Sequence, residues 1–149
     1  MKKVLGILIL LYGLTACTTN PDFKLYEGGP LNIAVIGDAP EVKEDQVVFE
    51  EIDFEDLFDN NLKAYDAVFI MEAKLLEASQ GKYADIYLNS NLPFFFIGAT
   101  TSYRPFLEQE VTYDKDLDLK DVSNHYAIGV EEETYWYFGY IMMWLAKKI

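Results

Sequence analysis

Three short apolar runs, each of five to seven residues, limit what this chain can fold into more than any other feature of its sequence. They span residues 31–37 (LNIAVIG), 67–71 (AVFIM) and 93–98 (PFFFIG). A nearly continuous apolar run of this length is typical of a strand that is buried on both faces of a sheet. Residues 47–52 and 126–130 are two further strand candidates, so we expect a sheet of about five strands.

Helical patterns separate these strands. Apolar residues recur at helical spacing in residues 73–88, where Gly81 is the weakest point of the pattern. Residues 133–148 have acids at their start and lysines at their end, which suits the helix dipole, and residues 54–62 form a shorter candidate. Apolar strands that alternate with helices predict a mostly parallel sheet between two helical layers, which is a three-layer α/β fold.

The first connection is short for this architecture. Nine residues link Gly37 to Val47, whereas a crossover between parallel strands usually takes about a dozen or more. Either the helix of this crossover has shrunk to a turn, or these two strands are not parallel.

The order of strand, helix and strand also resembles known domains. The pattern YDAVFI, then a helix, then LPFFFIG is similar to flavodoxin-like domains and to class I glutamine amidotransferase-like domains, over residues 31–149. The resemblance implies the same three-layer sheet. Amidotransferase relatives have a cysteine in a turn after a strand, but the matching turn here reads Gly98-Ala99-Thr100-Thr101. We therefore expect the architecture without that nucleophile, and no enzyme.

The N-terminal residues have the pattern of an export signal. Lys2 and Lys3 precede an apolar stretch at residues 4–14. This stretch is too short for a bilayer-spanning helix, which takes roughly 20 residues. The next residues, LTAC at 14–17, match the lipobox and resemble the bacterial lipoprotein family, whose conserved thiol corresponds to Cys17.

This second resemblance implies that residues 1–16 are removed and that the acylated Cys17 anchors the protein in the lipid bilayer. The protein is then expected at the cell membrane on its extracytoplasmic face, or at the periplasmic face of an outer membrane. Residues 17–30 would form a lipidated tether, and residues 31–149 a single acidic α/β domain. An ordinary secretory signal or an uncleaved N-terminal anchor is the alternative.

Acidic residues dominate the expected mature chain. Without Lys2 and Lys3 it has ten basic and 25 acidic residues, a formal charge of −15. Nucleic acid binding depends on clustered lysine and arginine, so we expect no nucleic acid partner. Cys17 is the only cysteine, so the domain has no disulfide. We expect no cofactor and no metal, and we interpret the aspartate-rich residues 114–121 as a solvated loop.

A ligand of a doubly wound sheet would bind at the carboxyl ends of its strands. Arg104, the only arginine, follows one of them, and a guanidinium there could bind a carboxylate or phosphate. Its alternative role is an ion pair with one of the many acids. Ser102 and His125 lack the Gly-x-Ser-x-Gly elbow of a serine hydrolase. The candidate ligand-binding residues are Asp38, Glu72, Thr100, Ser102 and Arg104.

The C-terminal helix pattern is unusually aromatic. Trp136 and Phe138 lie away from its expected core face, which makes them candidates for docking a partner. The sequence thus predicts a membrane-anchored lipoprotein that binds an envelope protein without catalysis. The alternative is a small-ligand-binding or degenerate enzyme-like domain with its site around Arg104.

Overall fold

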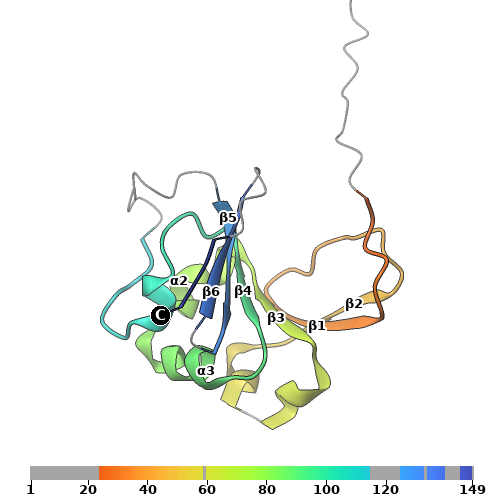
Figure 1. The fold of residues 1–149 in the computed structure, drawn as a ribbon. Coiled ribbons are helices and arrows are strands. Elements are labelled where there is room, and N and C mark those ends of the chain that lie inside the picture. Colours follow the sequence, from red (N-terminus) through yellow and green to blue (C-terminus); the bar gives the residue numbers. More distant parts are fainter. Residues whose placement is uncertain (1–23, 59, 115–124, 133, 140–144, 149) are drawn as a thin grey trace, which may run out of the picture.

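A single mixed sheet organises the domain (Figure 1). The computed structural model describes residues 24–58, 60–114, 125–132, 134–139 and 145–148. Within them, seven strands form the sheet in the order β2-β1-β3-β4-β5-β6-β7. The strands are β1 (Leu31–Ile36), β2 (Val47–Glu51), β3 (Ala67–Ile70), β4 (Phe94–Ile97), β5 (His125–Glu131), β6 (Thr134–Gly139) and β7 (Leu145–Lys148).

The strands that the sequence predicts are confirmed as β1 to β5, with ends within one residue of those expected. β1 pairs in parallel with both β2 and β3, and β3 pairs in parallel with β4. The connection between β1 and β2 contains no helix, so the first of the two alternatives for this short link is correct.

The predicted three-layer, mostly parallel flavodoxin-like sheet is wrong. β4, β5, β6 and β7 are antiparallel to one another in succession, so half of the neighbouring pairs are antiparallel. The large buried side chains of the described helical segments all belong to one core cluster on one face of the sheet. Antiparallel neighbours can be joined by short turns, whereas parallel ones need crossovers. Among the described residues after β4, the one helix, α4, packs into the main core and does not cover the other face.

The helical segments of the described chain are short. They are η2 (Phe54–Phe58), η3 (Asn60–Ala64), η4 (Glu72–Lys74), α2 (Leu75–Ala78), η5 (Gly81–Tyr83), α3 (Ala84–Asn89) and α4 (Arg104–Leu107). The single helix predicted at 73–88 is thus interrupted between α2 and η5. The Ser79 hydroxyl accepts a bond from Tyr113 N at 2.9 Å, and a Cβ on Gly81 would lie 2.6 Å from the carbonyl oxygen of Gln109. The loop around residues 109–113 packs into this break.

The predicted C-terminal helix at 133–148 is also wrong. Its described residues form β6 and β7, while residues 133 and 140–144 lie outside the described part of the chain. β5 and β6 form a hairpin in which Glu131 pairs with Thr134, and Glu132 adopts a positive φ of 51° in the turn. Such a close return places residues 134–139 beside β5 as a strand.

Aromatic rings fill the core between the sheet and the helical layer. Phe96 on β4 stacks on Phe106 of α4 with ring centroids 3.9 Å apart. Tyr87 of α3 lies 5.0 Å from Phe94 and 5.1 Å from Phe96, again between ring centroids. All four side chains are fully buried, so they fix α3 and α4 against one face of β4.

We predict that Gly98→Ala destabilises the fold. Gly98 ends β4 with a φ of +82°, and a Cβ there would lie 2.7 Å from the Cβ of Glu72. The left-handed conformation costs a non-glycine residue roughly 1–2 kcal/mol, and the clash adds to this cost. Urea unfolding should show a loss of about 2 kcal/mol or more in the free energy of unfolding.

Gly29→Ala is the matched control, because a Cβ at Gly29 would meet no atom within 4 Å. Its midpoint of unfolding should stay close to that of the wild type. Equal midpoints for the two variants would contradict the tight turn after β4.

Candidate functional site

The sheet has a second apolar face, opposite the main core. Ile33, Val35 and Ala67 are buried on it, and Phe69 and Phe95 are half-buried beside them. No described helix contributes a side chain to this cluster. We call this surface the open face, and Figure 1 shows α2 and α3 on the other side of the sheet.

A row of phenylalanine rings crosses the open face. The ring centroids of Phe49 and Phe69 are 5.9 Å apart, those of Phe69 and Phe95 5.3 Å, and those of Phe95 and Phe138 5.6 Å. These rings stand on β2, β3, β4 and β6. A Cβ on Gly129 of β5 would lie 3.0 Å from the Phe138 ring and 3.1 Å from the Phe95 ring. The glycine therefore lets the two rings meet across β5.

Both predicted docking residues lie on β6. Trp136 pairs with Gly129, and Phe138 contacts Phe95, so the two side chains share the open face. Both are half-buried. They stand two residues apart on a strand and not on a helix, and their role in docking stays a prediction.

The open face has no positive charge over its first six strands. β1 to β6 contain no lysine or arginine, whereas Glu51 ends β2 and Glu131 ends β5. The Glu51 carboxylate accepts a bond from Ala39 N at 3.2 Å. The face is thus apolar in its centre and has acids at the ends of β2 and β5, while Lys148 of β7 pairs with Thr134, the partner of Glu131.

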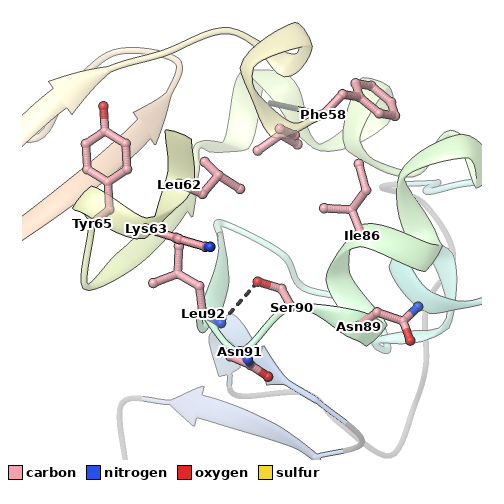
Figure 2. A pocket seen from close by; sticks show the side chains of 10 residues that line it. Phe58, Leu62, Lys63, Tyr65, Ile86, Asn89, Ser90, Asn91 and Leu92 are labelled. Atoms are coloured by element: carbon pink, nitrogen blue, oxygen red, sulfur yellow. Dashed lines mark hydrogen bonds between the residues drawn. The ribbon is translucent and has the colours of Figure 1, made fainter. Parts of the chain in front are cut away.

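A cavity of about 530 Å³ lies at the amino ends of β3 and β4, within the helical layer (Figure 2). Its apolar lining comes from η2, η3, α3 and the loop before β4. The lining residues are Leu57, Phe58, Leu62, Lys63, Tyr65, Ile86, Asn89, Ser90, Asn91 and Leu92. Sequence analysis missed this site, although asparagine-rich turns at 60–61 and 89–91 mark its position.

Two polar groups point into this cavity. Figure 2 shows the Lys63 ammonium and the Ser90 hydroxyl directed toward the space between Leu62 and Ile86. Ser90 Oγ accepts a bond from Leu92 N at 3.0 Å. At the rim, partial burial and a hydrogen bond with Glu50 raise the pKa of Tyr65.

Of the five candidate ligand-binding residues, only Asp38 lines an acidic notch at the carboxyl end of the sheet. Asp38 lines this notch of about 430 Å³ together with Glu51, Asp53, Asp56 and Lys74. Glu72, Thr100, Ser102 and Arg104 are absent from its lining. Glu72 packs against Gly98.

No group of three or more His, Cys, Asp or Glu residues in the described chain is arranged to hold a metal ion. Of residues 114–121, all but Asp114 lie outside the described chain.

Arg104 forms the ion pair that the sequence left open as an alternative. Its Nε and Nη2 donate to the two carboxylate oxygens of Glu108 at 2.7 and 2.8 Å, and both side chains are exposed. The hydrogen bond from Arg104 holds the pKa of Glu108 below its usual value. Ser102 Oγ accepts from Arg104 N at 3.3 Å, and Thr100 is exposed. The guanidinium thus has a structural partner one helical turn away.

His125 is a buried packing residue. Its Nε2 lies 2.8 Å from the carbonyl oxygen of Thr101, and its ring lies 4.7 Å from that of Tyr137. Burial raises the pKa of Tyr137 to about 12. Tyr137 packs against the main core cluster, so these contacts lie on the main-core face of β5 and β6.

We predict that Gly129→Ala is tolerated if the open face is uncovered. The added Cβ meets the edges of two half-buried rings, which can tilt outward. The free energy of unfolding should change by less than about 1 kcal/mol, since alanine also restricts the unfolded chain. Gly81→Ala, whose Cβ would meet backbone, should cost about 2 kcal/mol. If urea unfolding shows equal losses in the free energy of unfolding for Gly129→Ala and Gly81→Ala, the rings beside Gly129 are held in place by a covering layer.

Comparison with protein-family models, with curated proteins and with solved structures found no match for this chain. Among the described residues, no helix is both long enough and apolar enough to cross a membrane. The candidate function therefore rests on the geometry of the open face and of the cavity, together with the N-terminal sequence.

Proposed function

We propose that this chain is a lipid-anchored, extracytoplasmic binding protein that docks a partner on its open face without catalysis. The observation that supports this proposal is the row of four phenylalanine rings on a sheet face that no described helix packs against. The rings are half-buried, and partly exposed aromatic rings gathered on one face of a domain are typical of an interaction site.

The anchor is supported by the sequence of residues 1–17, which lie outside the described chain. The described chain begins near the β2 edge of the sheet. Tyr26 N donates to Glu44 Oε1 at 3.3 Å, and Gln46 Nε2 donates to Tyr26 O at 2.6 Å. The seven residues from Cys17 to Phe23 span at most about 25 Å. An acylated Cys17 would thus hold the domain close to the bilayer surface.

The chemistry of the open face favours an amphipathic helix as the partner. On the opposite face, helices already pack against the same strands. Strands that are apolar on both faces are normally covered by helices on both. A helix with an apolar stripe would replace the layer that the hairpins β5 to β7 do not supply.

Charge favours a basic helix over other occupants. The expected mature chain has a formal charge of −15, and Glu51 and Glu131 stand at strand ends on the open face. Lysine or arginine beside the apolar stripe of a partner would face these acids. A second copy of the chain, or an anionic bilayer, would instead bring like charges together.

The hydrogen bonds of Ser102 and His125 favour binding without catalysis. The two groups that a serine hydrolase would combine are bonded elsewhere, since Ser102 Oγ contacts Arg104 N and His125 Nε2 contacts the Thr101 carbonyl. A nucleophile and its base would instead be within hydrogen-bond reach of each other.

The lipid anchor predicts a specific modification. Cells that express the full chain and receive an alkyne-tagged fatty acid should label the protein, and Cys17→Ser should abolish the label because the thiol is the acylation site. Mass spectrometry should find the N-terminus of the mature protein at residue 17. An unlabelled wild-type chain would contradict the anchor.

Docking on the open face predicts that a substitution at Phe49 of β2 weakens partner binding, whereas a substitution at its neighbour Val48 does not. The probe is a helical peptide of leucine and lysine, about 15 residues long, titrated into the full chain carrying Cys17→Ser. Phe49→Gln should weaken binding by about tenfold or more, because it places a polar group in the ring row. Val48→Gln is the control, since Val48 is 56 % exposed on the other side of β2 and should leave the affinity unchanged.

A peptide of leucine and glutamate should not bind, because its charge matches that of the protein. Equal affinities of the Phe49→Gln and Val48→Gln variants would show that the lysine peptide binds by charge alone. That result would contradict docking on the open face.

A further inference from the structure

The cavity in the helical layer is lined by apolar and by polar side chains in nearly equal parts. Leu57 is buried in its wall, and Leu62, Ile86 and Leu92 are half-buried around it. Its volume of about 530 Å³ lies within the range of about 300–1,000 Å³ that is typical of small-molecule sites. The cavity is open to solvent, and its apolar wall can contact the body of a small molecule.

Besides Tyr65, Asn89 and Asn91, the polar lining residues are Lys63 and Ser90, and these two can donate hydrogen bonds into the cavity. Lys63 makes no ion pair within 4.0 Å with any described residue, although the chain has 25 acids. No carboxylate occurs among the described lining residues. Ser90 Oγ already accepts from Leu92 N, so its proton points to another acceptor. A positive ammonium and a hydroxyl donor thus face the apolar space together (Figure 2).

We propose that this cavity binds a small amphipathic carboxylate, with the apolar body against Leu57, Ile86 and Leu92 and the carboxylate at Lys63 and Ser90. Charge-assisted hydrogen bonds are the stronger class of polar contact, so the ammonium should dominate the polar part of recognition. The site is independent of the open face, because the two lie on opposite sides of the sheet and share no residue. Either proposal can fail without the other.

The charges of the lining residues favour a carboxylate head over a cationic or an uncharged one. A cationic head would meet Lys63 at close range with no described acid in the lining to compensate. An uncharged head would make no charge-assisted contact with the exposed Lys63 ammonium. The acidic surface repels anions at long range, but this repulsion is screened beyond about 8 Å at physiological salt. Local contacts at Lys63 therefore decide the preference.

The test is isothermal titration calorimetry of the full chain carrying Cys17→Ser. The probe is decanoate, used below its micelle concentration, with decyltrimethylammonium as the probe of opposite charge and equal chain. Decanoate should bind saturably at one site per chain, and the cationic probe should not bind. Lys63→Gln should weaken decanoate binding about tenfold or more, because it removes a charge-assisted contact. Ile86→Ser should weaken it by removing part of the apolar wall.

Lys74→Gln is the matched control, since Lys74 lines the acidic notch and not this cavity. It should bind decanoate as the wild type does, and circular dichroism should show that each variant is folded. Three results would each overturn the proposal: no saturable decanoate binding, equal binding of the two probes, or equal losses in Lys63→Gln and Lys74→Gln.

Discussion

The contact of Phe94 and Phe96 with the rings of the helical layer is the interaction on which the rest of the structure depends. Phe96 stacks on Phe106, and Tyr87 packs against both strand residues. Tyr87 also donates its hydroxyl to Ala78 O at 3.1 Å, which ties α3 to α2. One pair of residues on β4 therefore sets the position of α2, α3 and α4 on the same face of the sheet.

The ring row on the open face also depends on β4. Alternate residues of a strand point to opposite faces, so Phe95, between the two core phenylalanines, must point away from the helical layer. There it meets Phe69 and Phe138 and completes the ring row. The strand is apolar on both faces, but the strands beyond it in the sheet are antiparallel neighbours. Its second face has no helical layer in the described chain, because α4, the described helix between β4 and β5, packs on the main-core face.

Sequence analysis could identify the strands better than their surroundings. The run at 93–98 predicts β4 because burial on both faces requires nearly continuous apolar residues. The four residues 135–138 are all aromatic, so strand and helix periods fit them equally, and the turn at Glu132 decides between the two. The cavity could not be predicted, because Lys63 lies on η3 and Ser90 follows α3, and only the packing of these two segments brings them together. Arg104 was a candidate for its position after β4, but its partner is Glu108, four residues later on the same helix.

The acidic net charge of the chain affects which partners the open face can bind. A sheet face with half-exposed rings would by itself favour association between copies of a protein. Two copies of the expected mature chain would each bring a formal charge of −15, so electrostatic repulsion opposes their pairing. The same charge attracts a cationic helix from a distance of about 8 Å at physiological salt. Acidity therefore disfavours self-association and favours a basic partner, and added salt weakens both effects together.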